Sequence, residues 1–70
     1  MDHEVKSAGK ATEIASSFIK KYRWFVRPLK AVRENDAWLV EIDVAPIAPI
    51  IAKVKIDAKS GDILEYTIPS

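Results

Sequence analysis

The stretch from residue 37 to residue 68 reads AWLVEIDVAPIAPIIAKVKIDAKSGDILEYTI, and apolar side chains occupy nearly every second position of it. Alternation with a period of two is typical of β-strands that bury one face. The alternation breaks between Pro46 and Pro49 and again at 58–61, where proline and glycine interrupt strand pairing. The pattern therefore predicts three strands, at 37–44, 50–57 and 62–68.

A fourth strand is expected immediately upstream, at residues 29–34. Asn35 and Asp36 tolerate a left-handed backbone, so they are suited to a tight turn between this strand and the next. Gly61 is expected to supply a positive φ in the last hairpin, as a type I turn with a bulge requires. These turns predict one antiparallel meander of four neighbouring strands.

The residues before the strands have a helical pattern. Ser7 is a suitable N-cap because its hydroxyl can accept a hydrogen bond from the first turn. Pro28 cannot lie inside a helix, so the helix is expected to end before it, near residue 24. Apolar residues spaced by three and four predict one buried helix face: Ala8, Ala11, Ile14, Ala15, Phe18, Ile19 and Tyr22. The chain is thus expected to be a single α+β domain over residues 1–70, with a flexible tail at 1–6, a helix at 7–24 and an antiparallel sheet at 29–68.

Turn lengths also predict the register of the strands. The turn at 35–36 places Lys30 opposite Glu41, a loop centred on Ala48 places Glu41 opposite Lys55, and the last hairpin places Lys55 opposite Glu65. The same loop places Asp43 opposite Lys53. The open face of the sheet is then expected to carry a ladder of alternating charge, which consists of Lys30, Glu41, Lys55 and Glu65. The other face is expected under the helix, and it consists of Leu29, Ala31, Trp38, Val40, Ile42, Val44, Ala52, Val54, Ile56, Leu64, Tyr66 and Ile68.

Apolar residues on the open face and in the proline loop indicate a surface for protein contact. Leu39 is expected beside Val32 on the open face, and an uncharged loop tip with isoleucines is unusual for a surface that meets only water. The candidate contact residues are Val32, Leu39, Ile47, Ile50, Ile51 and Ile63. The expected partner is another protein or a second copy of the chain, and a homodimer could pair Glu41 with Lys55 across a two-fold axis.

A second candidate surface combines basic and aromatic residues near the end of the helix, a composition typical of sites that stack bases and contact phosphates. Its residues are Lys20, Lys21, Arg23, Trp24 and Arg27. Residues 1–33 carry eight lysines and arginines against three acids, whereas residues 34–70 carry three lysines against seven acids. The net charge of the whole chain is only +1, so it gives no general attraction to nucleic acid. Nucleic-acid binding is therefore the alternative to protein binding.

Composition argues against an enzyme, a metal site and a bound cofactor. The chain has no cysteine, and its one histidine, His3, has no ligand at metal-binding spacing beside it. Most acidic residues fall in turns or opposite lysines, so surface ion pairs explain them. No segment approaches the roughly 20 apolar residues of a membrane span. The charged N-terminus and absent cysteines predict a cytoplasmic location, with secretion left open if a signal has been removed.

The segment from Val54 to Tyr66 reads VKIDAKSGDILEY. It resembles the closing hairpin of PepSY-type domains, in which a strand ends in a Val-Asp-Ala-Lys-Thr-Gly pattern and a short strand follows. The strand at 37–42 and the alanine-rich helix also match that family's arrangement. The resemblance implies a non-enzymatic module that binds or restrains a peptidase. The proline loop at 46–49 departs from the family pattern.

Overall fold

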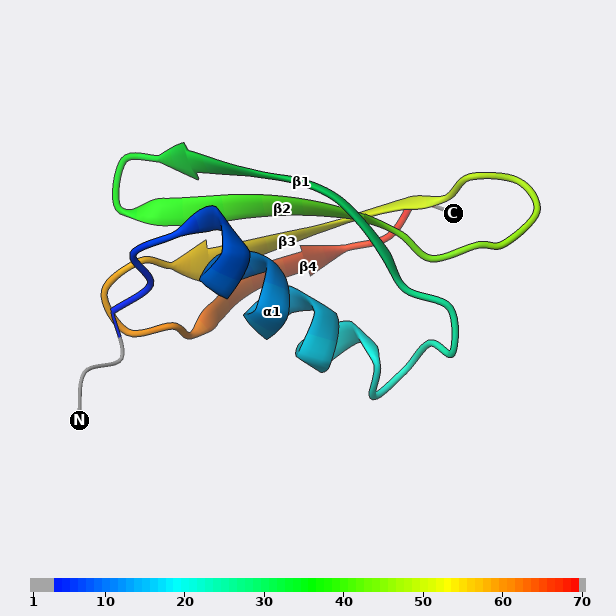
Figure 1. Ribbon diagram of the computed structural model, residues 1–70, viewed down its shortest axis with the longest axis horizontal. Coiled ribbons are helices and arrows are strands. Elements are labelled where there is room, and N and C mark those ends of the chain that lie inside the picture. The colour runs from blue at the N-terminus through cyan, green and yellow to red at the C-terminus, as the bar shows by residue number, and fades with distance from the viewer. Residues whose placement is uncertain (1–3, 70) are drawn as a thin grey trace.

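The computed structural model describes residues 4–69 (Figure 1). Within them, one helix precedes four antiparallel strands, which lie side by side in the order β1-β2-β3-β4. The predicted α+β class and the meander are therefore confirmed. The elements are α1 at Ala8–Ile19, β1 at Arg27–Glu34, β2 at Ala37–Asp43, β3 at Ile51–Asp57 and β4 at Ile63–Thr67.

The helix begins where the sequence predicts and ends earlier. Ser7 has an extended backbone, and its hydroxyl accepts a hydrogen bond of 3.1 Å from the Lys10 amide, so the predicted N-cap is confirmed. After Ile19 the chain tightens, because the Tyr22 amide donates to the Ile19 carbonyl three residues back. The predicted helix end near residue 24 is wrong for this reason. Tyr22 is also not a core residue, since it is 65% exposed, although its ring packs edge-to-face with that of Phe18.

The residues before the helix are part of the core. Val5 is 1% exposed, and its amide donates to the Ala58 carbonyl at 2.7 Å. Its carbonyl accepts a hydrogen bond of 2.9 Å from the indole nitrogen of Trp38. The prediction of a flexible tail at residues 1–6 is therefore wrong for the part around Val5. Val5 covers the end of the core at the N-terminal side of α1. His3 and the rest of residues 1–3 lie outside the described residues.

The first hairpin follows the predicted register. Lys30 lies opposite Glu41, and their side chains form an ion pair of 3.5 Å, as predicted. Asn35 makes the turn with a φ of 54°. A bulge separates Pro28 from Lys30, because these two residues pair with the adjacent residues Ile42 and Glu41. Leu29 is the extra residue and is 47% exposed, so its predicted place under the helix is wrong.

The middle hairpin is shifted by two residues from the predicted register. Glu41 lies opposite Lys53 and not Lys55, Leu39 lies opposite Lys55, and Asp43 lies opposite Ile51. The loop is thus centred on residue 47. A shift of two leaves every side chain on its predicted face. The charge ladder divides into two separate parts: Lys30, Glu41 and Lys53 in one row, and Lys55 with Glu65 in the next.

The last hairpin confirms the positive φ of Gly61, which is 79°, and the pairing of Lys55 with Glu65. A bulge follows, because Ile63 pairs with Ile56 and leaves Leu64 without an opposite residue. Ile63 therefore turns to the helix side, while Leu64 is 56% exposed. Both predicted faces are wrong for this one reason, since a bulge inverts the alternation.

Candidate protein-contact site

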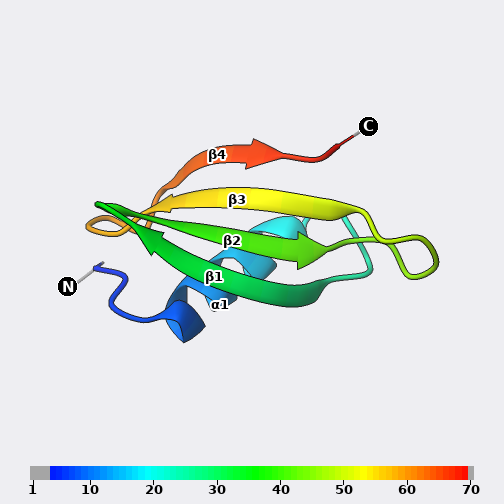
Figure 2. The same cartoon turned by 90° about the horizontal axis from the view of Figure 1, so that it is seen from above.

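The helix covers only part of its side of the sheet. In Figure 2, α1 lies beneath β1 and β2, while β4 lies at the far edge. The backbone of α1 packs mainly on β1 and β2 and less on β3. Its contact with β4 runs through side chains such as Phe18, whose ring meets the Tyr66 ring edge-on with centroids 5.1 Å apart. The inner side of β4 is therefore the least covered part of the sheet.

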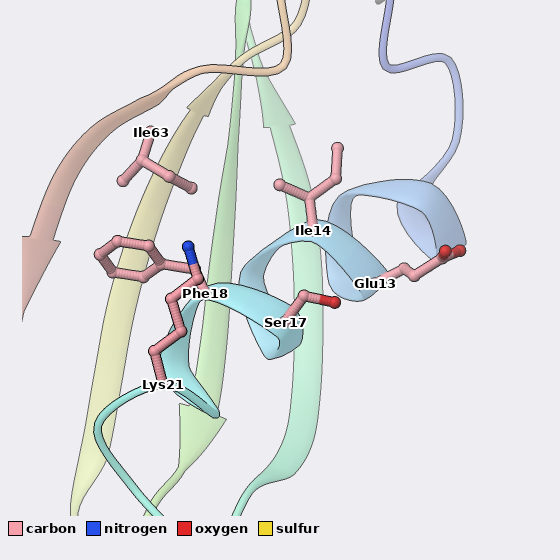
Figure 3. Close-up of a pocket in the computed structure, with 6 residues that line it drawn as sticks. All are labelled: Glu13, Ile14, Ser17, Phe18, Lys21 and Ile63. Atoms are coloured by element: carbon pink, nitrogen blue, oxygen red, sulfur yellow. The ribbon is translucent and has the colours of Figure 1, made fainter.

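A groove opens between α1 and the start of β4. Its volume is about 320 Å³, and its walls are Glu13, Ile14, Ser17, Phe18, Lys21 and Ile63. Phe18 from the helix and Ile63 from β4 point toward each other across it, while the exposed Glu13 and Ser17 point to the side away from Ile63 (Figure 3). Ile14, Phe18 and Ile63 are only partly buried. The groove thus has an apolar floor, with Glu13, Ser17 and Lys21 along its rim.

The outer edge of β4 borders this groove, and the two edges of the sheet differ in their protection. β1 carries Pro28, a bulge, and the exposed cations Lys30 and Arg33, which are features that discourage pairing with another strand. β4 carries one charge, Glu65, and a bulge only at its beginning. Among the described residues, no strand pairs with the outer side of β4. The outer edge of β4 can therefore form hydrogen bonds with a further strand more easily than the edge of β1 can.

The structure does not bring the predicted contact residues together. Val32 and Leu39 are opposite each other on the open face, as predicted. Ile47 is 95% exposed at the tip of the proline loop, but Ile50 packs against the core. Ile51 is half-buried opposite Asp43, and Ile63, as described above, lines the helix side. The predicted apolar surface is therefore two small separate patches, and Ile63 belongs to a different site.

A smaller depression of about 90 Å³ lies on the open face. Its lining residues are Leu39, Lys53, Lys55, Glu65 and Thr67. Neither Lys55 nor Glu65 forms an ion pair with the described residues, although they lie opposite each other. The open face next to β4 is therefore polar and charged, in contrast to the apolar groove on the helix side of the same strand.

The proline loop is held by a buried carboxylate. Asp43 is 2% exposed, and one of its oxygens accepts hydrogen bonds from the amides of Ala45 (3.1 Å) and Ile50 (3.3 Å). Its other oxygen accepts a hydrogen bond of 3.1 Å from Arg27. The Ala45 amide and, less strongly, the Ile50 amide and Arg27 lower the pKa of Asp43, although burial opposes this. These bonds explain why the loop closes on residue 47.

The basic and aromatic candidates surround the turn after α1. Lys20, Lys21 and Arg23 are exposed, and Trp24 is 85% exposed beside the edge of Phe25, with ring centroids 5.9 Å apart. Arg27 does not belong with them, because it pairs with Asp43. Four of the five predicted residues therefore gather on one exposed turn.

The last hairpin uses its acids for structure. Asp57 accepts hydrogen bonds from the Ser60 hydroxyl at 2.7 Å and the Lys59 amide at 3.3 Å, and the Ser60 bond is the main cause of its lowered pKa. Within residues 4–69, no three histidine, cysteine, aspartate or glutamate side chains form a group able to hold a metal ion. In the same part of the chain, no helix combines the length and apolar character needed to cross a bilayer.

Comparisons with protein families, characterised proteins and solved structures found no match to this chain. The site is therefore defined by its own geometry, which consists of an apolar groove beside a strand edge. Ile14 and Phe18 were not predicted as site residues because their spacing assigned them to the buried helix face, and no site was predicted to include Ser17. The sequence did contain one indication of this site, because a single helix is too narrow to cover all four predicted strands.

Proposed function

We propose that this chain is a non-enzymatic module that binds another protein through the groove between α1 and β4. The observation that carries the proposal is the partly covered inner side of β4, where Phe18 and Ile63 leave an open groove of about 320 Å³. Burial of the partly exposed apolar walls against a partner lowers the free energy of the complex. An adjoining strand edge offers main-chain hydrogen bonds to the same partner.

One feature of the sequence supports this proposal, and a second concerns the compartment. The resemblance of residues 54–66 to the closing hairpin of PepSY-type domains implies the same class of function, with a peptidase as the partner. The absence of cysteine fits a reducing compartment such as the cytoplasm.

Binders selected from a phage-displayed random peptide library against the wild type provide the test. Ser17→Trp places an indole at the rim of the groove from an exposed position, so it should reduce binding at least ten-fold without unfolding the helix. Lys20→Trp introduces the same side chain at an exposed position that does not line the groove, and it is the matched control. Binders that bind both variants as well as the wild type would show that the groove is not the contact site.

Nucleic-acid binding is the second candidate, because Trp24 is 85% exposed beside three exposed cations. Fluorescence anisotropy of a labelled single-stranded oligonucleotide should then show binding that weakens with salt, since phosphate contacts release counterions. Trp24→Ala should weaken it further by removing a stacking surface. Binding that does not change with salt or with this substitution would argue against this candidate.

A further inference from the structure

We infer that the partner adds an extended segment to the outer edge of β4 as a fifth strand, with apolar residues over the groove and a lysine or arginine opposite Glu65. This inference rests on the proposed function, and it names the chemistry of the segment that the site takes. The groove and the strand edge form one site, because Ile63 belongs to both.

The two sides of β4 require different residues of an added strand. Successive side chains of a strand point to opposite faces, so every second residue of the segment lies on the helix side. There it lies beside Ile63 and Tyr66 and below the Phe18 ring, all of which are partly buried apolar groups. The intervening residues lie on the open face, beside Glu65 and Thr67. The site therefore selects alternating apolar and polar residues.

Glu65 sets the charge of the polar residues. Glu65 is exposed, and it lies opposite Lys55 of the neighbouring strand β3. No ion pair forms between Glu65 and the described residues. A residue opposite it on an added strand would have its Cβ atom about 5 Å away, where opposite charges attract and like charges repel. The row then continues the alternation of sign that Lys55 and Glu65 begin. A cation at this position is therefore favoured over an acid.

A second copy of the chain suits the site less well. If β4 pairs antiparallel with β4 of another molecule about a two-fold axis, the two Glu65 carboxylates lie close together. In every register that pairs most of the strand, they are opposite each other or one diagonal step apart, where like charges repel. The other edge of the sheet, β1, is hindered by Pro28 and by its bulge. A basic, apolar segment of a different protein avoids both obstacles.

Synthetic fluorescein-labelled heptapeptides of alternating valine and lysine test the inference by fluorescence anisotropy. We expect this peptide to bind more tightly than one of alternating valine and glutamate, and than a peptide of the same composition with valines spaced by three. Glu65→Lys should reverse the charge preference, with a change of about 1.4- to five-fold for each peptide, the range of one cross-strand charge pair. Glu34→Lys makes the same charge change at the end of β1, where it is exposed, and should leave the preference unaltered.

Amide hydrogen exchange distinguishes strand addition from other modes of binding. The valine–lysine peptide should slow the exchange of outward-facing amides between residues 63 and 67, and should leave those at the outer edge of β1 unaffected. Protection elsewhere, or a charge preference that survives Glu65→Lys, would overturn the inference. If heptapeptides fail to bind while library-selected binders still depend on Ser17, strand addition is wrong and the groove remains a contact site. A dimer in sedimentation that Glu65→Lys alters would favour a second copy and also overturn the inference.

Discussion

Replacing Trp38 by phenylalanine removes the donor that fastens the N-terminal segment to the sheet. The indole nitrogen of Trp38 donates to the Val5 carbonyl at 2.9 Å, and both residues are buried, at 8% and 1% exposure. A buried acceptor that loses its partner costs about 1–3 kcal/mol. The smaller ring also leaves a void, so the free energy of unfolding should fall by about 2–3 kcal/mol in total. For a domain of this size that is a decrease of roughly 8–24 °C in Tm.

Urea denaturation followed by far-UV circular dichroism measures the loss, because this signal does not depend on the tryptophan that has been removed. Trp24→Phe is the matched control: Trp24 is 85% exposed, so the same substitution there should change stability by less than about 0.5 kcal/mol. The Val5 amide, which donates to Ala58, should exchange faster in Trp38→Phe. Equal effects of the two substitutions would refute the role given to this hydrogen bond.

Three further predictions concern the two glycines, the two hydrogen-bonded aspartates and the tip of the proline loop. Gly61→Ala should lower the free energy of unfolding by about 1–2 kcal/mol, because Gly61 has a φ of 79°. Gly9→Ala in α1 should raise the free energy of unfolding by about 0.5–1 kcal/mol, since the nearest atom to an added Cβ is 4.0 Å away. Denaturant titration measures both changes. The lowered pKa values of Asp43 and Asp57 stabilise the fold above about pH 4, and this stabilisation is lost as pH falls through the folded-state values, so Asp43→Asn should flatten the acid decline of Tm. Ile47→Asp should change Tm little because the side chain is 95% exposed, and a large loss would show that the loop tip is packed.

Local chemistry explains which parts of the fold the sequence predicts. The N-cap at Ser7 and the left-handed backbone at Asn35 and Gly61 depend on residues next to one another, so the sequence is sufficient for them. Strand alternation identifies the face of each side chain where the strand has no bulge. It does not distinguish registers that differ by two residues, and for this reason the middle hairpin was misplaced. The hydrogen bonds of Asp43 select the observed register, and they form only in the folded loop.

The candidate site depends on distances that the pattern does not contain. Whether α1 reaches β4 is decided by the width of the sheet and by the position of the helix across it. Ile63 faces the groove because of a bulge one residue away, and alternation alone placed it on the opposite face. The apolar character of Phe18 was evident from the sequence, but its partial exposure was not.

The two bulges make the length of the chain adjustable at two positions. Deleting Leu64 would join Ile63 directly to Glu65, whose partners Ile56 and Lys55 are already adjacent, so both halves of the hairpin would keep their faces. Deleting Leu29 would join Pro28 to Lys30 in the same way. The loss of one residue elsewhere in a strand turns every following side chain to the wrong face. A related chain that is one residue shorter within a strand is therefore expected to lack one of these two leucines.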